Sequence, residues 1–453
     1  MKEINIIGGG LAGSEAALYL ANKGYKIKFF EMRPKKQTGA HTTGDFAEFV
    51  CSNSLGSTAL TSASGLLKKE IEILGSSLIP LAKKHSVPSG NSLSIDRFGF
   101  SSAVTKLIKE NENIDIINDE VESIPDGTTL IATGPLTSTA LCSDLCKTFG
   151  EEHFKFFDAI APIVKKDSIN FDKAFFGARW DKGEADFINC PFNKEEYLKF
   201  YEILSGAEKI ELKEFEKEVF KGTKAKFFEG CMPIEQIASR GIDTLRFGPM
   251  KPVGLFDRRL FKEGDEAKFK KQQFYAVVQL RQDDKEANLY NLVGFQTNLK
   301  WGEQKRLIQS IPGLQNAEIA RYGVMHANTF INSPKILNKS LQTNMRPDLF
   351  FAGQITGVEG YTESIATGLF AAINIERYLE NKPLLELQNV SMLGALLDYI
   401  TFKEHKNFQP VNSNWGIVAE MELPKHIRKN KEEKNTLLSN RAIDYINNLK
   451  NMI

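Results

Sequence analysis

The chain has 453 residues, more than one compact core usually supports, so we expect two domains or one domain with a large insertion. A net charge of +1 excludes attraction of nucleic acid through overall charge and leaves only a local basic patch for such a partner. No apolar run reaches the roughly 18 residues of a membrane helix, and the N-terminus enters a strand with no signal peptide, so we expect no membrane partner. The five cysteines form no CxxC pair and are odd in number, which indicates reduced thiols in the cytoplasm: Cys51, Cys142, Cys146, Cys190 and Cys231.

The chain begins with a glycine turn inside a βαβ unit. Residues 4–7 are apolar, three glycines follow at G-x-G-x-x-G spacing, an alanine-rich helix comes next, and a second strand over 26–30 ends at Glu31. The glycines permit a tight turn and close approach to a pyrophosphate, while the helix N-terminus offers N–H groups and Glu31 can accept hydrogen bonds from a ribose. The pattern predicts an adenine dinucleotide site, the alternative being a turn that binds nothing. Its predicted residues are Gly8, Gly9, Gly10, Leu11, Ala12, Gly13 and Glu31.

Cys51 follows residues 46–50, which look like a strand, and opens a polar loop over 52–56. A thiol at the end of a strand in this domain could touch a bound flavin ring. The alternative is a small, buried apolar side chain.

A further buried strand is predicted near residue 130, ending in a turn that contains Thr133 and Gly134. Parallel sheets bind ligands at the carboxyl ends of their strands, so we place both residues in the cofactor site. From about 155 to 325 the sequence pattern changes to Phe-rich and Lys-rich segments with strand-like runs at 275–280 and 291–295. This pattern predicts an inserted α+β domain with antiparallel strands.

Cys231 precedes Pro233, which is well placed as the first residue of a helix, with Glu235 in its first turn. The helix dipole would there favour thiolate over thiol, as a nucleophile requires. A buried structural cysteine is the alternative.

Two basic segments, 256–271 and 425–431, are candidates for RNA contact, although such runs are usually solvated faces. The six histidines lack metal-ligand spacing, so no metal site is predicted. His41 and His326 fall in segments that look like loops and could touch a ligand.

The α/β texture returns late in the chain. A strand over 348–353 ends at Gly353, and Gly360, Tyr361 and Thr362 lead into an apolar helix over 365–372. This unit favours FAD over NAD, because a second helix N-terminus can face the flavin and stabilise the negative charge of its reduced form. A βα unit without a ligand is the alternative. We therefore predict an α/β fold, with a Rossmann-like FAD-binding domain from 1–154 and 326–453 and an inserted α+β domain over 155–325.

Long motifs make the chain resemble one family, the bacterial folate- and FAD-dependent tRNA uracil-5-methyltransferases (TrmFO). The resemblance runs from residue 1 to about 420, although the segment 256–272 looks longer than expected for the family. The motifs lie at 31–56, 247–255, 277–285, 292–297, 305–314, 321–329, 357–368 and 414–417.

The resemblance implies a particular chemistry. A thiolate adds to C6 of uracil and makes an enolate that attacks through C5. The one-carbon unit comes from 5,10-methylenetetrahydrofolate by way of the reduced flavin, which NADH or NADPH regenerates. The family motifs assign the nucleophile to Cys231, and they assign to Cys51 a role at the flavin or as general base. Less specifically, Tyr361 or His326 would stack on the pterin, and Lys251 and Arg281 would meet the folate tail or RNA phosphates.

Several alternatives remain open at this point. The RNA could be tRNA or 23S ribosomal RNA, and a non-catalytic paralogue that binds FAD and RNA is a further possibility. A sister family that builds carboxymethylaminomethyl groups on wobble uridines carries a long helical C-terminal domain, for which this chain ends too early. An S-adenosylmethionine enzyme is disfavoured because the late βα unit would have no role. No obligate protein partner is inferred.

Overall fold

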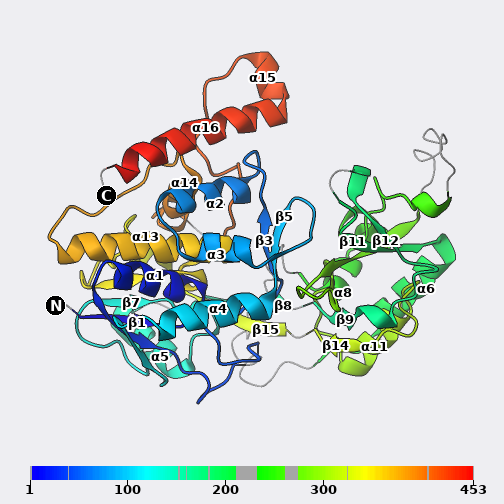
Figure 1. Ribbon diagram of the computed structural model, residues 1–453, viewed down its shortest axis with the longest axis horizontal. Helices are drawn as coiled ribbons and strands as arrows, with labels where there is room; N and C mark the ends of the chain where they lie inside the picture. The colour runs from blue at the N-terminus through cyan, green and yellow to red at the C-terminus, as the bar shows by residue number, and fades with distance from the viewer. Residues whose placement is uncertain are drawn as a thin grey trace.

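The computed structural model describes residues 3–38, 40–150, 154–159, 161–181, 184–210, 232–260, 274–323, 325–405 and 408–451. Two bodies lie side by side (Figure 1). One holds a parallel sheet with its helices, and the other holds an antiparallel sheet formed by the middle of the chain. The predicted α/β class, a Rossmann-like domain with an inserted α+β domain, is confirmed.

The parallel sheet joins the beginning and the end of the sequence. Its strand order is β16 (Leu349–Phe351), β7 (Thr129–Ile131), β1 (Glu3–Ile7), β2 (Lys26–Phe30) and β6 (Ile114–Ile117), and every neighbouring pair is parallel. Strands β7 and β16 are buried along their whole length, as expected where helices cover both faces. The strands predicted near residues 5, 28, 130 and 350 therefore belong to one sheet.

Helix α1 (Leu11–Asn22) packs against α13 (Tyr361–Leu379) at very short range. A Cβ atom on Gly368 would lie 2.3 Å from the carbonyl oxygen of Ala12, so the contact requires glycine there. The other helices of this body are α2 (Ala63–Ile73), α3 (Leu78–Lys84), α4 (Arg97–Lys109), α5 (Thr139–Phe149), α12 (Ser333–Ile336), α14 (Met392–Ile400), α15 (Lys425–Lys429) and α16 (Lys431–Lys450). A small sheet of β3 (Ser54–Ser57), β5 (Ser92–Ile95) and β4 (Ser86–Val87) lies beside them.

The second body has its own core and an antiparallel sheet. The strand order is β10 (Phe175–Gly177), β11 (Phe187–Phe192), β12 (Ala276–Gln282), β13 (Leu289–Leu292), β9 (Ile163–Lys165) and β14 (Ile319–Arg321). Its helices are α6 (Lys194–Gly206), α8 (Ile234–Ala238), α9 (Thr244–Phe247) and α11 (Trp301–Gln309). The antiparallel pair β8 (Phe154–Ala159) and β15 (Met325–Phe330) carries the chain into and out of this body. We therefore propose domain boundaries close to residues 154 and 325.

Four local predictions were wrong. Residues 46–50 form a turn and not a strand, because Ala47 has a φ of +53° and the Glu48 side chain folds back onto residues 42 and 43. The loop predicted over 52–56 contains β3, which pairs with β5. His326 lies in β15 opposite Asp158 and not in a loop, since cross-strand pairing imposes an extended backbone there. Pro233 precedes α8 as its N-cap, one position earlier than predicted.

Two fully buried carboxylates cap helices that belong to other parts of the chain. Glu15 on α1 accepts hydrogen bonds from the N–H groups of Ser77 and Leu78 at 2.7 and 2.9 Å, at the start of α3. Glu70 on α2 accepts them from Met392 and Leu393 at 2.7 and 2.8 Å, at the start of α14. Burial raises the pKa of Glu15 to about 7 and that of Glu70 to about 8, although the backbone hydrogen bonds act in the opposite direction.

The substitution Glu70→Gln should change how stability depends on pH. The pKa of this carboxyl is about 8 in the folded protein and 4.5 ordinarily, so folding binds a proton between these values. Its contribution to stability is therefore present below pH 4.5 and is lost as the pH rises through 8. We expect the free energy of unfolding to fall less steeply over this range in the variant, as measured by urea unfolding at a series of pH values. The exposed control Glu110→Gln should keep the wild-type slope, and an unchanged slope in Glu70→Gln would contradict the assignment.

Candidate functional site

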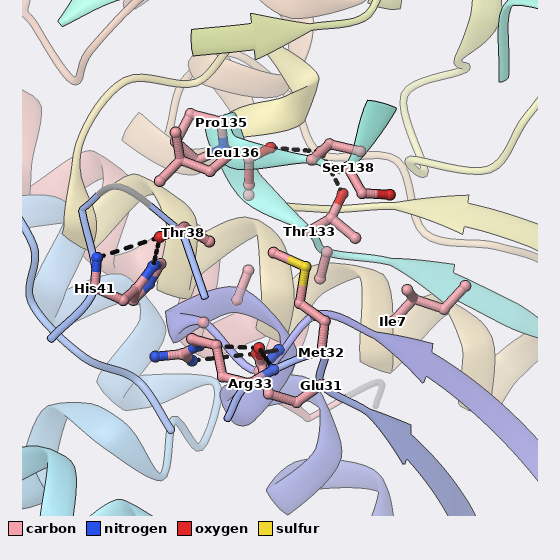
Figure 2. Close-up of a pocket in the computed structure, with 18 of the residues that line it drawn as sticks. Ile7, Glu31, Met32, Arg33, Thr38, His41, Thr133, Pro135, Leu136 and Ser138 are labelled. Carbon is pink, nitrogen blue, oxygen red and sulfur yellow. Dashed lines mark hydrogen bonds and ion pairs between the residues drawn. The ribbon is translucent and has the colours of Figure 1, made fainter. Parts of the chain in front are cut away.

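A cavity, here called the first cavity, opens at the carboxyl ends of the parallel strands (Figure 2). Its walls come from the glycine turn after β1, the end of β2, the segment 38–50, the end of β7 and the start of α13. Most of the predicted cofactor residues line it: Gly8, Gly9, Gly10, Leu11, Ala12, Glu31, Thr133, Gly134, Gly353 and Tyr361. Gly13, Gly360 and Thr362 lie outside this lining, and the Thr362 hydroxyl donates to the carbonyl of Leu55 at 2.9 Å.

The glycines of the turn differ in what they do. Gly8 has a φ of +103°, and a Cβ atom there would lie 2.6 Å from the carbonyl oxygen of Ala132. A Cβ atom on Gly13 would lie 1.9 Å from the carbonyl oxygen of Gly8. Gly10 has an ordinary φ of −76° and no atom within 4 Å of its Cβ position. Gly8 and Gly13 are therefore required by the fold, whereas Gly10 leaves open space at the cavity.

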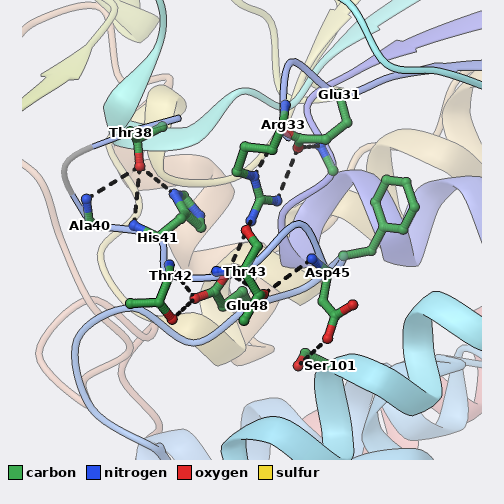
Figure 3. Close-up of polar contacts among 12 residues, drawn as sticks. Glu31, Arg33, Thr38, Ala40, His41, Thr42, Thr43, Asp45, Glu48 and Ser101 are labelled. Atoms are coloured by element: carbon green, nitrogen blue, oxygen red, sulfur yellow. Dashed lines mark hydrogen bonds and ion pairs between the residues drawn. The ribbon is translucent and has the colours of Figure 1, made fainter. Parts of the chain in front are cut away.

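Glu31 is held by Arg33 at the edge of the first cavity (Figures 2 and 3). The Arg33 Nε donates to Glu31 at 2.9 Å, its Nη1 donates to Glu48 at 3.1 Å, and all three side chains are buried. The Gly9 N–H donates to the second oxygen of Glu31 at 2.8 Å. Burial raises the pKa of Glu31, but the hydrogen bonds and charge of Arg33 outweigh it and leave the pKa below its usual value. Glu31 is therefore an ionised acceptor at the cavity.

Glu48 organises the segment that covers this edge (Figure 3). Its oxygens accept hydrogen bonds from the hydroxyls of Thr42 and Thr43, both at 2.8 Å, and from the Thr42 N–H at 2.8 Å. The His41 ring lies 2.6 Å from the Thr38 hydroxyl, and both residues line the cavity. Sequence reasoning missed Arg33 and Glu48, although an arginine two positions after the acid that ends β2 is a signal for such a pair.

Tyr361 connects the first cavity to Cys51. It is the first residue of α13, and its hydroxyl accepts the Cys51 N–H at 2.7 Å. Its ring packs edge-on against Phe49 with centroids 4.4 Å apart. The first cavity includes Val50 and Tyr361 in its wall, so Cys51 stands directly beside it.

Cys51 itself lines a second cavity of about 410 Å³ between the two bodies. The opposite walls come from the inserted part of the chain, namely β12, β13, the segment 232–237, Pro249 and the turn over 293–296. The full lining is Cys51, Ser52, Ala161, Met232, Ile237, Pro249, Arg281, Asn291, Leu292, Val293, Gly294 and Gln296. Cys51 thus lies at the junction of the two cavities.

Three arginines gather behind Cys51. Arg97 donates to Asp283 at 2.9 Å and to the carbonyl of Cys51 at 3.4 Å, and Arg321 donates to the same carbonyl at 3.2 Å. Burial lowers the pKa of Arg281 and that of Arg321 to about 10 each. Burial raises the pKa of Asp283, but the charge and hydrogen bond of Arg97 outweigh this effect and leave the pKa below its usual value. All these groups are charged at neutral pH.

The remaining predicted site residues and the two basic segments lie outside the described residues or at the surface. Cys231 lies outside the described residues, but Met232, the next residue, lines the second cavity. The side chain of His326 is also outside the described part, and Lys251 is exposed. The basic segment 256–271 is described only as far as residue 260, and 425–429 form α15 at the surface. Over the described ranges there is no group of three or more His, Cys, Asp or Glu side chains suited to a metal, and none of the helices there could span a membrane.

Comparison with known proteins identifies the family. A family model described as glucose inhibited division protein A matches residues 3–383. Proteins from Bacillus mycoides (strain KBAB4) and Bacillus cereus (strain G9842) are 51% identical to this chain over 449 residues, which cover 99% of each sequence. Both are named methylenetetrahydrofolate--tRNA-(uracil-5-)-methyltransferase TrmFO. The chain belongs to the TrmFO family.

Solved structures confirm the fold of this TrmFO member. Two crystal forms of Aquifex aeolicus GidA superpose with a TM-score of 0.67 at 17% sequence identity. The match covers 99% and 100% of this chain and 73% and 76% of the GidA chains. At this identity the likeness concerns the fold alone.

The substitution Gly13→Ala should destabilise the protein. The added methyl group would overlap the Gly8 carbonyl oxygen, a backbone atom that cannot move without opening the β1–α1 turn. We expect a loss of about 1–3 kcal/mol or more in the free energy of unfolding, as for other overpacked sites, measured by urea unfolding. Gly302→Ala is the matched control, because this glycine also lies near the start of a helix but has no atom within 4 Å. Equal stability of the two variants would contradict the close packing at Gly13.

Proposed function

We propose that this protein methylates carbon 5 of a uridine in tRNA, with 5,10-methylenetetrahydrofolate as one-carbon donor, FAD as bound cofactor and NAD(P)H as reductant. The observation that carries the proposal is the position of Cys51 at the junction of the two cavities. Family membership supports the same reaction, since relatives 51% identical over the whole chain carry it in their names.

The first cavity fits an adenine dinucleotide such as FAD. Helix α1 begins at Gly10 without a side-chain cap, so its first N–H groups are left for an anion. The open space at the Gly10 Cβ position gives a pyrophosphate room to approach the backbone. Gly8–Ala12 would hold the phosphates, Glu31 would accept from the ribose, and Thr133, Gly134, Gly353 and Tyr361 would meet the rest. Gly360 and Thr362, which flank Tyr361 in the sequence, would position it.

Bound FAD supplies two-electron redox chemistry, which turns a methylene unit into a methyl group. The residues of the chain position and protect the reacting groups. Tyr361 fixes the Cys51 backbone at the first cavity, and its ring could also stack on a pterin. His326 remains a second candidate for this stacking, and Lys251 for contact with an anionic folate tail or an RNA phosphate.

We assign the two cysteines different roles. Cys231 is the proposed nucleophile: its sulfur forms a bond to uracil C6, and the electron pair of the C5–C6 double bond moves through C4 onto the exocyclic oxygen O4. Position 231 is joined by one peptide bond to Met232, which shares the second cavity with Cys51. Cys51 is the proposed general base or assistant at the flavin, consistent with its place between the two cavities. Helix α8 is anchored nearby, because Glu235 accepts from the hydroxyl of Thr297 at 2.9 Å.

The purified protein should form 5-methyluridine in an unmodified tRNA transcript when supplied with methylenetetrahydrofolate and NADPH. Mass-spectrometric mapping is expected to place the methyl group on the T-loop uridine. Fragments of 23S ribosomal RNA should stay unmodified in a parallel reaction. Methylation of ribosomal RNA alone would retain the chemistry and change the substrate. Failure on both RNAs, with FAD bound and reducible, would leave a non-catalytic binding protein.

The variants Cys231→Ala and Cys51→Ala should each reduce this methylation by at least about 1000-fold, because each removes a group that reacts directly. Cys146→Ala is the matched control, since this partly buried thiol lies on α5 and lines neither cavity. FAD absorbance should be the same in all three proteins. A Cys51→Ala variant with wild-type turnover would remove Cys51 from the mechanism.

A further inference from the structure

The surroundings of Cys51 carry more positive than negative charge. Arg97, Arg281 and Arg321 interact electrostatically with one another and with Asp283. Within the described residues, only Asp283 forms an ion pair with any of the three, and its partner is Arg97. The cluster therefore has three cations and one anion at neutral pH.

Arg281 is the arginine that this network leaves without a partner. Across the described part of the chain its side chain makes no hydrogen bond, and its Nε is buried without one. The residue as a whole is half-buried, and withdrawing an unpaired charge from water even in part is unfavourable. The side chain also lines the second cavity, beside Cys51. A guanidinium kept in this state is suited to a ligand with carbonyl oxygens or negative charge.

The lining of the second cavity is suited to a heteroaromatic ring, which needs apolar walls and a few polar groups. Its walls include the apolar side chains of Met232, Ile237, Pro249 and Leu292. Its polar groups are few and come from β12, β13 and the turn after β13, chiefly Arg281 and Asn291. Apolar walls with a small number of placed polar groups are typical of small-ligand pockets. A phosphate would gain nothing from the apolar walls.

We propose that Arg281 binds the O4 edge of the target uracil and stabilises the negative charge that forms there, with Arg97 and Arg321 holding the surrounding field positive. This inference rests on the proposed function. When sulfur bonds to C6, the C5–C6 π bond breaks and its electron pair moves through C4 to O4. No proton leaves the ring in this step, so the charge on O4 must be met by the protein. A preplaced cation at that oxygen is the most effective way to lower the barrier.

The test measures single-turnover methylation of two tRNA transcripts, which carry either uridine or 4-thiouridine at the target position. Wild type, Arg281→Gln, Arg281→Lys and Arg321→Gln are compared, and tRNA affinity is measured at several salt concentrations. Arg306→Gln is the matched control, because it removes the same charge from the exposed face of α11. FAD absorbance and thermal unfolding report whether each variant is folded.

We expect Arg281→Gln to methylate uridine about 100- to 1000-fold more slowly, as for loss of an oxyanion-stabilising group, with tRNA affinity within about twofold of wild type. Replacing O4 by sulfur should slow wild type but leave Arg281→Gln almost unaffected, because the partner of O4 is already absent. Arg281→Lys should be intermediate and keep some preference for uridine. Arg306→Gln should behave as wild type.

Two results would overturn the assignment of Arg281. The first is a wild-type rate in Arg281→Gln, or an unchanged uridine preference in that variant. The second is weaker tRNA binding with a salt dependence reduced by about one charge, which would make Arg281 a phosphate contact. If Arg281→Gln does not fold, the other two variants test the proposal. A reduced uridine preference in Arg281→Lys together with slower turnover in Arg321→Gln supports it. Wild-type behaviour of both variants refutes it. Failure of wild type to methylate any RNA would overturn the proposed function itself.

Discussion

Three side chains from distant parts of the sequence hold the backbone of Cys51. The hydroxyl of Tyr361, at the start of α13, accepts its N–H, while Arg97 of α4 and Arg321 of β14 donate to its carbonyl oxygen. Hydrogen bonds that involve a charged group contribute about 1.5–3 kcal/mol each. Because the three partners belong to both bodies, the thiol is fixed with respect to the parallel and the antiparallel sheet at once. The hydrogen bond between Tyr361 and Cys51 thereby joins a residue of the first cavity to a residue of the second.

The molecule treats its buried charges in two different ways. Glu15 and Glu70 are matched by helix N-termini, and Arg33 is matched by the carboxylates of Glu31 and Glu48. In each of these places the buried ionisable group has its hydrogen-bond partners within the fold and needs no ligand to complete them. The positive charges of the arginines near Cys51 are balanced only in part, by the carboxylate of Asp283 and by backbone carbonyl groups. An imbalance of this kind lowers stability unless a ligand completes it, and strained electrostatics of this kind is typical of functional sites.

Local sequence patterns were sufficient for most elements of the parallel sheet and insufficient for the contacts between elements. The glycine turn, four of the five strands of the parallel sheet and the late unit around Gly353 were predicted, whereas β6 was not. Residues 46–50 misled because a short, mostly apolar run also fits a turn, and only the partners of Glu48 decide between the two structures. Arg97 and Arg321 had no signal at all, since they reach Cys51 from 46 and 270 positions away. The roles of Cys51 and Cys231 came from family motifs and remain proposals.

The first cavity belongs to the shared fold, whereas the second cavity is where the proposed chemistry takes place. GidA shares the fold at 17% identity, and Gly8 and Gly13 of the turn after β1 serve the backbone geometry of that fold. Apart from Cys51 and Ser52, the second cavity is lined by residues of the inserted part of the chain, chiefly from β12, β13 and the segment after position 231. Under the proposed function, the side chains of the insertion that line the second cavity would face the target uridine, whereas the glycine turn of the first cavity would hold only the cofactor.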